Sequence, residues 1–320
     1  MRPLRVGTRA SMLALWQARH VESLLRAQPG APPVELVHIR TEGDARTDVP
    51  LWQVQGKAFF TKEIDRALLE GKVDIAVHSL KDLATALEPG VELAATLARE
   101  DPRDALISRD GATLAELPRG ARVGTSSLRR RAFLARRRKD AVQLELRGNV
   151  PTRVERLKSG DYDAIILAAA GLKRLGLEGR VSEYLDAAEW PPAVAQGVIG
   201  VCAREGDEET RRWLAGLDDR AARLAASAER SLLRTLEGGC QVPLGALARL
   251  SGEELHLNVR LCALDGSQSL RGEGAAGTSA ATISVEDAIR LGERVARELL
   301  ARGAASLIAS EREARAVDEP

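Results

Sequence analysis

Short apolar runs and apolar positions at helical spacing alternate along the first two thirds of the chain. Residues 34–37 and 73–77 are typical of buried strands, residues 12–27 are apolar at helical spacing, and residues 61–70 form a second helix candidate. This alternation of strand and helix predicts a parallel α/β sheet. Residues 41–59 show no period, and irregular segments of such length inside compact domains are often functional.

The same order of elements returns in the second hundred residues. Two pairs of short motifs mark the repeat, namely Val6-Gly7-Thr8 with Val123-Gly124-Thr125, and Gly71-Lys72-Val73-Asp74 with Gly160-Asp161-Tyr162-Asp163. We therefore predict two α/β lobes of related topology, joined by links near residues 95–105 and 190–200. Two such lobes would leave a ligand cleft between them.

The pattern changes near residue 218. A helix is predicted at residues 221–236, and every second position from 255 to 261 is apolar, as in a half-buried strand. Asp265-Gly266 is a hairpin signal, and residues 285–300 form a last helix candidate. The C-terminal third is therefore predicted to be a small α+β domain.

Composition and charge exclude several classes of protein. No apolar run approaches the roughly 20 residues that span a bilayer, and no signal-peptide core is present. The aromatic content of 3% argues against a stacking platform for nucleic acid. The three cysteines and four histidines lack the spacing of a disulfide framework or a metal site. A reducing cytoplasm is expected, with no metal, no membrane and no nucleic-acid partner.

Arginine dominates the basic residues, because only seven of the 47 are lysine. Arg129, Arg130 and Arg131 lie in the predicted first turn of a helix, where the macrodipole favours anions over cations. We expect a carboxylate or phosphate site there, since hydroxyls, free backbone N–H groups and guanidinium groups occur together. A solvated basic helix face is the alternative, and it is the preferred interpretation for the second cluster at 136–139.

Further arginines follow predicted strands. Arg9, Arg147 and Arg153 stand at or just after strand ends, and ligands of open α/β sheets gather outside the carboxyl ends of the strands. Each could be a plain surface residue, but together they could converge on one polyanionic ligand. Lys81-Asp82 follows a strand in the same way, and its carboxylate could accept protons or stabilise a cation. An ordinary surface ion pair is the alternative for Asp82.

Cys240 stands between two glycines and a proline. Gly238 and Gly239 tolerate positive φ, and Pro243 ends any regular structure, so we expect the thiol at the tip of a short, stiff loop. A glycine-capped helix end with an incidental cysteine is the alternative.

Together these stretches resemble the porphobilinogen deaminase (hydroxymethylbilane synthase) family over essentially the whole chain. The motifs that carry the resemblance are residues 14–17, 74–82, 101–104, 124–130, 146–150, 163–168, 170–175 and 237–243. The resemblance implies that Cys240 carries a covalent dipyrromethane cofactor through a thioether, which the enzyme builds from its own substrate. Four porphobilinogens would be added head to tail with loss of ammonia, and water would release hydroxymethylbilane.

The resemblance also implies the role of each site residue. Asp82 would be catalytic, assisting loss of ammonia, stabilising the azafulvenium cation and handling pyrrole N–H protons. The cofactor carboxylates would be held by Ser79, Lys81, Thr125, Ser127, Arg129, Arg130 and Arg147. The incoming substrate would meet Arg9, Ser11, Gln17, Arg147 and Arg153. Because every pyrrole carries an acetate and a propionate, the growing chain would gather carboxylates along these arginines.

The implied fold class is α/β, with two periplasmic-binding-protein-like α/β lobes around a cleft plus a small C-terminal α+β domain. Residues 1–98 with 198–217 would form the first lobe, residues 99–197 the second, and residues 218–320 the domain with the cofactor cysteine. A monomer is the family expectation.

Some positions depart from the family pattern, and one rival function stays open. Met12 stands where proline is common, Leu83-Ala84 where valine-proline is common, and Ala195 where glycine is common. Residues 55–58 are poorer in glycine than usual, within a segment 45–60 that could act as a lid. The rival is a non-catalytic two-lobed anion-binding protein, which would need neither Cys240 nor Asp82.

Overall fold

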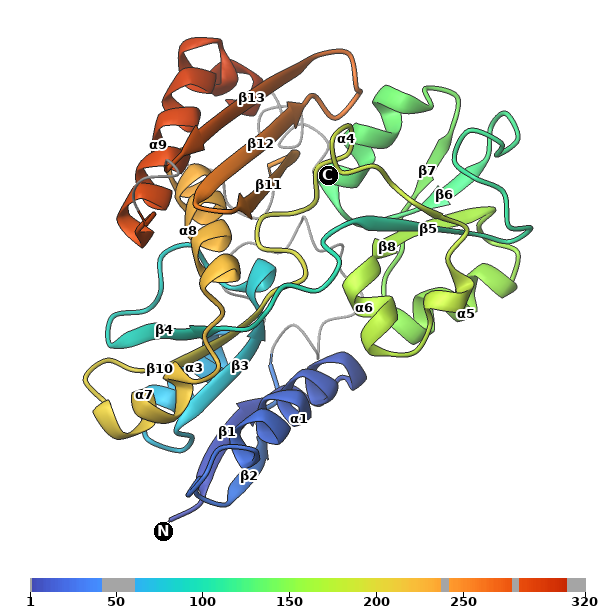
Figure 1. The fold of residues 1–320 in the computed structure, drawn as a ribbon. Helices are drawn as coiled ribbons and strands as arrows, with labels where there is room; N and C mark the ends of the chain where they lie inside the picture. Colours follow the sequence, from blue (N-terminus) through green and yellow to red (C-terminus); the bar gives the residue numbers. More distant parts are fainter. Residues whose placement is uncertain (1, 42–60, 237–241, 278–281, 310–320) are drawn as a thin grey trace.

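The computed structural model describes residues 2–41, 61–236, 242–277 and 282–309. Two five-stranded sheets and one three-stranded sheet form three separate bodies of the molecule (Figure 1). The expected lid segment 45–60 and the loop with Cys240 lie outside the described residues.

The first sheet has the strand order β2-β1-β3-β10-β4. Strands β1, β2 and β3 run parallel, whereas β10 pairs antiparallel with both β3 and β4. Its elements are β1 (Leu4–Thr8), α1 (Met12–Arg26), β2 (Val34–His38), α3 (Lys62–Leu69), β3 (Ile75–Ser79), the 3-10 turn η1 (Leu80–Asp82), β4 (Val91–Thr96), β10 (Ile199–Arg204) and α7 (Glu208–Ala215). Strand β10 comes from the chain that returns after the second sheet.

The second sheet has the equivalent order β7-β6-β8-β5-β9. Strands β6, β7 and β8 run parallel, and β5, which enters from the first link, pairs antiparallel with β8. Its elements are β5 (Asp104–Ser108), β6 (Arg122–Gly124), α4 (Leu128–Arg137), β7 (Val142–Leu144), α5 (Val150–Lys158), β8 (Ala164–Ala168), α6 (Ala169–Arg174), the 3-10 turn η2 (Glu178–Arg180) and β9 (Glu183–Tyr184). The two lobes therefore share one topology.

The repeated aspartates explain the sequence echo between the lobes. Asp74, just before β3, accepts hydrogen bonds from the backbone N–H of Arg5 at 2.9 Å and from its guanidinium at 2.8 Å. Asp163, just before β8, accepts from the backbone N–H of Arg122 at 2.8 Å and from its guanidinium at 3.1 Å. Each aspartate thus joins the first and third parallel strands of its sheet at their amino ends.

The C-terminal body packs two helices on one antiparallel sheet. Its elements are α8 (Arg220–Thr235), β11 (Leu244–Ser251), β12 (Glu254–Cys262), β13 (Ser269–Ala276) and α9 (Val285–Ala301). Gly292 allows α8 and α9 to touch closely, because a Cβ there would collide with the carbonyl oxygen of Ala228. One buried apolar cluster joins this body to Ile64 and Leu68 of the first lobe. The predicted fold class, two related α/β lobes plus a small α+β domain, is confirmed.

A buried carboxylate joins all three bodies where the links cross. Glu229 of α8 is completely buried and accepts from both terminal nitrogens of Arg99 in the first link, at 2.6 and 3.1 Å. It also accepts from the backbone N–H of Ala195 in the second link at 2.6 Å and from that of Ala248 in β11 at 2.7 Å. Ala195 has φ 59°, in the left-handed region that glycine prefers. The alanine therefore stands in strained backbone, and its N–H meets Glu229.

We predict a large loss of stability for Glu229→Gln. Removing one partner of a buried ion pair lowers the free energy of unfolding by about 3–5 kcal/mol, because the other charge is left buried without a partner. The midpoint of chemical denaturation measures the effect. The matched control is Glu253→Gln, whose carboxylate meets Arg220 at 2.7 Å on the surface of the same body; it should shift the midpoint little. Equal shifts for the two variants would show that the buried contacts of Glu229 stabilise the protein no more than a surface ion pair does.

Candidate functional site

Lys81 and Asp82 project from the carboxyl end of β3. The strand ends at Ser79, and the 3-10 turn η1 follows. Leu80 is fully buried and its N–H donates to the Val198 carbonyl oxygen at 3.0 Å, which anchors the turn. Lys81 is half-buried and Asp82 is exposed. The placement predicted from the sequence is therefore the one that the structure has.

Lys81 lies among charges from the second lobe. Burial lowers the pKa of Lys81 to about 8, Asp82 and Asp104 favour its charged form, and Arg130 and Arg129 oppose it. Its Nζ donates to Oε1 of Gln196 at 3.3 Å. A lysine with such a pKa exchanges its proton readily near neutral pH, and a bound carboxylate would favour its charged form.

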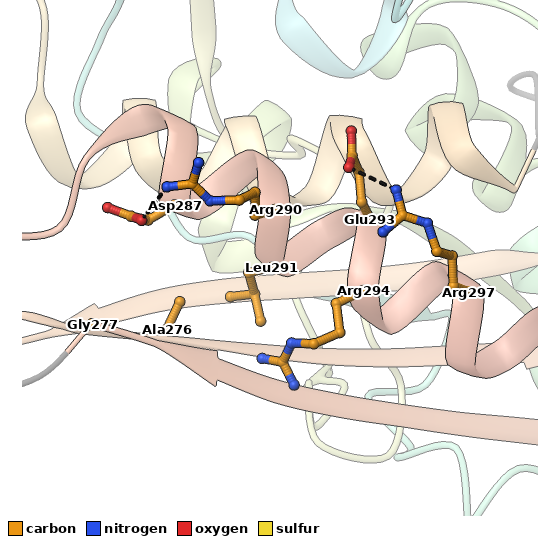
Figure 2. Close-up of a pocket in the computed structure, with 8 residues that line it drawn as sticks. All are labelled: Ala276, Gly277, Asp287, Arg290, Leu291, Glu293, Arg294 and Arg297. Atoms are coloured by element: carbon orange, nitrogen blue, oxygen red, sulfur yellow. Dashed lines mark hydrogen bonds and ion pairs between the residues drawn. The ribbon is translucent and has the colours of Figure 1, made fainter.

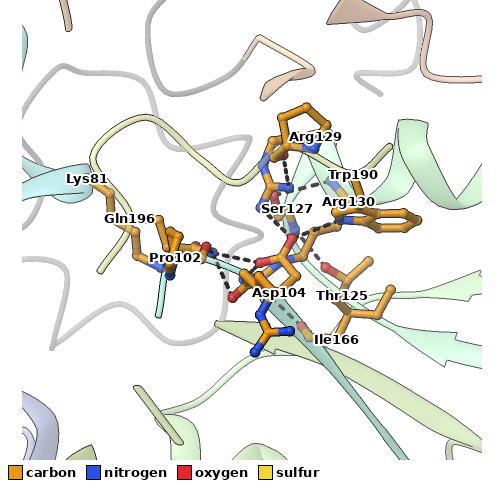
Figure 3. Close-up of polar contacts among 12 residues, drawn as sticks. Lys81, Pro102, Asp104, Thr125, Ser127, Arg129, Arg130, Ile166, Trp190 and Gln196 are labelled. Atoms are coloured by element: carbon orange, nitrogen blue, oxygen red, sulfur yellow. Dashed lines mark hydrogen bonds and ion pairs between the residues drawn. The ribbon is translucent and has the colours of Figure 1, made fainter. Parts of the chain in front are cut away.

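Arg129 and Arg130 begin α4, as predicted, and they meet a carboxylate of the protein itself (Figure 3). Asp104 is completely buried at the start of β5, and its two oxygens lie 2.7 Å from Nη2 of Arg129 and 2.8 Å from Nη2 of Arg130. Burial would raise the pKa of Asp104, but the two arginines outweigh it and hold that pKa below its usual range. The anion expected at this helix start is therefore partly supplied from within the chain.

The hydroxyls predicted beside these arginines serve the helix start. Ser127 is the N-cap of α4, and its Oγ accepts from the backbone N–H of Arg130 at 3.5 Å. Thr125 is buried, and its Oγ1 accepts from the N–H of Ser127 at 3.3 Å. Both side chains thus lie beside the arginine pair. Whether they also bind a cofactor stays a prediction.

Arg153 brings a further cation toward Asp82. It lies in α5 behind the Asn149 N-cap, and its Nε donates to the Gly148 carbonyl oxygen at 2.7 Å. Burial lowers the pKa of Arg153 to about 10, as do Arg130 and Arg147, whereas Glu145 and Asp82 favour its charged form. Asp82 of the first lobe therefore lies within electrostatic range of Arg153 in the second.

The residues expected to meet substrate lie around β1, α1 and β3. Gln17 is buried in α1, and its Nε2 donates to Oγ of Ser79 at 2.8 Å. Ser11 caps α1, accepting from the N–H of Ala14 at 3.3 Å. Arg9 follows β1. Burial lowers the pKa of His78 to about 4, and the charge of Arg9 adds to this effect. The structure thus gathers these residues at the same end of the first sheet as Asp82.

The two described cysteines are poor nucleophiles. Cys202 in β10 and Cys262 in β12 are both completely buried. Burial raises the pKa of their thiols to about 12 and about 11. Because the thiolate is the reactive form, neither sulfur suits attachment of a cofactor. Cys240 lies outside the described residues, between the end of α8 and Val242.

An arginine-rich hollow lies between α9 and β13 of the C-terminal body, with a volume of about 410 Å³ (Figure 2). Its arginines already have partners, because Arg290 meets Asp287 and Arg297 meets Glu293 at 2.7 and 2.9 Å. Arg294 donates to the Ala275 carbonyl oxygen at 2.8 Å, at the edge of the sheet. This hollow is therefore a solvated helix face.

The described residues contain no cluster of three or more histidine, cysteine or acidic side chains suited to a metal ion. Their helices include none that is long and apolar enough to cross a membrane.

The fold and the site define a class of protein with two similar α/β lobes. Lysine, arginine and aspartate side chains come together at the strand ends of these lobes, and such a site is suited to binding a small polyanion. Comparison with known families gives the class a narrower identity. Residues 4–212 match the family model "Porphobilinogen deaminase, dipyromethane cofactor binding domain", and residues 223–301 match "Porphobilinogen deaminase, C-terminal domain". The chain belongs to the porphobilinogen deaminase family.

Curated relatives agree over nearly the full length. The chain is 46% identical over 312 residues to a porphobilinogen deaminase of Syntrophomonas wolfei, covering 98% of this chain and 100% of the relative. It is 50% identical over 306 residues to a porphobilinogen deaminase of Roseiflexus sp., covering 96% and 98%. The expected transferase activity, that of a hydroxymethylbilane synthase, and the dipyrromethane cofactor are confirmed at family level. The non-catalytic rival is not favoured.

Solved structures show more distant likeness. The methionine-binding protein MetQ aligns with a TM-score of 0.44 at 13% identity, over 68% of this chain and 90% of MetQ. YhfZ from Shigella flexneri aligns with a TM-score of 0.38 at 18% identity, over 74% of this chain and 92% of YhfZ.

Three residues of the charged network escaped the sequence analysis as site residues, namely Asp104, Trp190 and Gln196. Asp104 stood in the motif at 101–104, whereas Trp190 and Gln196 stood in none of the motifs. The available signal was a carboxylate at the first position of an apolar strand, where a charge needs a partner.

Proposed function

We propose that the charged cluster around Lys81, Asp82 and the α4 arginines is the condensation site, and that Cys240 is its covalent attachment point for dipyrromethane. The observation that carries this proposal is the convergence of Asp82 from the first lobe with Lys81, Arg129, Arg130 and Arg153. These are the groups that a polycarboxylate primer and a cationic reaction intermediate require.

The donor set fits the cofactor. Cations outnumber carboxylates around Asp104, and within the described residues the Nε atoms of Arg129 and Arg130 are buried without a hydrogen-bond partner. A buried unpaired donor is unfavourable by roughly 1–3 kcal/mol, so an anion that reached this site would be stabilised there. When bound, dipyrromethane supplies the nucleophilic pyrrole carbon to which substrate units are added.

The residues of the chain divide the work. Asp82 accepts and returns protons at the reacting centre, and its charge stabilises the cation left when the substrate loses ammonia. Cofactor carboxylates are held by Ser79, Lys81, Thr125, Ser127, Arg129, Arg130 and Arg147. The incoming substrate is oriented by Arg9, Ser11, Gln17, Arg147 and Arg153.

Attachment at Cys240 is supported by elimination among the three cysteines. Cys202 and Cys262 are buried and have raised thiol pKa values, which leaves Cys240 as the candidate nucleophile. We also propose the domain bounds 1–98 with 198–217, 99–197 and 218–320, and a cytoplasmic monomer whose small-molecule partner is porphobilinogen.

Intact-mass measurement of the purified protein tests the proposal. The mass should exceed that of the bare chain by two pyrrole units, and acidic aldehyde reagent should colour the protein as a dipyrromethane. Porphobilinogen should be consumed with release of ammonia. A bare chain that does not acquire the adduct from porphobilinogen would refute the proposed function.

A further inference from the structure

The arginine pair of the proposed primer site is organised by one buried carboxylate, Asp104. Both oxygens of Asp104 are fully used: Oδ1 accepts from Arg130 Nη2 at 2.8 Å and from Gln196 Nε2 at 2.9 Å, and Oδ2 lies 2.7 Å from Arg129 Nη2 and accepts from Trp190 Nε1 at 2.9 Å. Figure 3 shows these donors converging on the carboxylate. Four donors on one carboxylate leave it little freedom to move.

Each arginine is also held by a backbone carbonyl group. Arg129 Nη1 donates to the Pro191 oxygen at 3.0 Å, and Arg130 Nη1 donates to the Ile166 oxygen at 3.0 Å. With one terminal nitrogen on a carbonyl group and the other on Asp104, the plane of each guanidinium is fixed. A guanidinium has five N–H donors, so each arginine keeps N–H groups for another anion, and among the described residues the buried Nε of each has no partner.

The network also crosses to the first lobe through Gln196. Its Oε1 accepts from Lys81 Nζ at 3.3 Å, while its Nε2 donates to Asp104 and, at 2.8 Å, to the Pro102 carbonyl oxygen. The orientation of the amide is dictated by its neighbours, because an ammonium group can only donate and an ionised carboxylate can only accept. Asp104 therefore also fixes the position of the Lys81 ammonium group, through the intervening side chain of Gln196.

We propose that Asp104 is a positioning residue for primer acquisition, the resident counter-ion that holds Arg129, Arg130 and, through Gln196, Lys81 ready for the carboxylates of dipyrromethane. Without it, three cations from two lobes would face one another with no fixed anion between them. Mutual repulsion would then turn the guanidinium groups toward solvent and away from a common ligand. This inference rests on the proposed function of the same site.

The test follows the loading of primer into chain produced without porphobilinogen. Asp104→Asn and its control Asp163→Asn are incubated with porphobilinogen, and the two-pyrrole adduct is followed by intact mass per folded molecule. Asp163 is the matched control, since it also holds an arginine of the second lobe, at 3.1 Å, but at the opposite end of β8. Asp104→Asn should load about tenfold or more slowly, as expected for loss of a buried charged partner. Asp163→Asn should load at the normal rate even where its Tm falls, and Asp104→Glu should recover part of the rate.

A second pair of variants decides the matter if Asp104→Asn does not fold. Trp190→Phe removes the Nε1–H donor to Asp104 but keeps an aromatic ring against Phe133, whereas Trp213→Phe makes the same change on α7 of the first lobe. Trp190→Phe should load roughly tenfold more slowly, because it removes one hydrogen bond to a charged group. Trp213→Phe should not slow loading.

The outcomes separate this inference from the proposed function. If the normal chain acquires the adduct and Asp104→Asn loads equally fast, Asp104 has no positioning role and the proposed function stands. Equal slowing of Asp104→Asn and Asp163→Asn would show a general effect of stability and would also overturn the inference. If the normal chain acquires no adduct, the proposed function fails and the inference with it.

Discussion

Cys240→Ser should give a folded protein with no pyrrole adduct and no measurable turnover of porphobilinogen. A serine hydroxyl keeps the size of the thiol but is a far weaker nucleophile, because only the thiol reaches its anionic form near neutral pH. Without the adduct there is no primer to extend, so the substitution abolishes the whole reaction rather than slowing a single step. Intact mass and the release of ammonia measure the two losses independently.

The other two cysteines provide the controls for this experiment. Cys202→Ala and Cys262→Ala remove buried side chains of β10 and β12, so each should lower the Tm yet keep the adduct. An adduct that persists in Cys240→Ser, or that disappears in either control while the protein stays folded, would place the attachment elsewhere. The raised thiol pKa values of Cys202 and Cys262 make that outcome unexpected.

The repeat in the sequence was a sound guide to the lobes, for a physical reason that Asp74 and Asp163 make clear. Each closes the same hydrogen-bonded junction with an arginine of the first strand, Arg5 or Arg122, so both sequence and geometry recur. The antiparallel strands β5 and β10 were less predictable. They are apolar like their parallel neighbours, and only the direction of the crossing links decides that they pair antiparallel.

The arginines at the start of α4 show where sequence reasoning on the site stops. Cations in the first turn of a helix predicted an anion, and this physical argument holds in the structure. The sequence could not say that Asp104, 25 and 26 positions earlier, would be brought to these two side chains by the pairing of β5 with β8. Long-range pairing, and not local pattern, decides which carboxylate meets which arginine.

Helix boundaries were easier to predict than charge partners, because caps are local. Ser11, Ser127 and Asn149 each accept a backbone N–H three residues on, at the start of α1, α4 and α5. The partners of the buried carboxylate Glu229, in contrast, are not local in the sequence. Glu229 lies on an apolar helix face where a pattern predicts core, and its four donors come from both links and the C-terminal sheet.

Asp82→Asn, made in protein that already carries the primer, should keep the adduct and slow turnover by about 10²–10⁴. The amide keeps the shape of the side chain but can neither accept a proton nor oppose a positive charge. Opposite charges about 4 Å apart attract by about 4 kcal/mol at an effective dielectric constant of 20. An energy of about 4 kcal/mol corresponds to roughly a thousandfold in rate if the attraction exists only in the transition state.

The steady-state constants distinguish catalysis from binding at Asp82. Loss of stabilisation in the transition state alone lowers kcat and kcat/KM together, whereas loss of substrate binding raises KM and leaves kcat unchanged. Asp140→Asn is the matched control, because Asp140 also meets an arginine, Arg138 at 2.9 Å, but on the outer surface of the second lobe. It should turn over normally. If Asp82→Asn changed KM alone, Asp82 would be a binding residue and the proton work would have to lie with another group, of which Lys81, with its pKa lowered to about 8, is the nearest candidate.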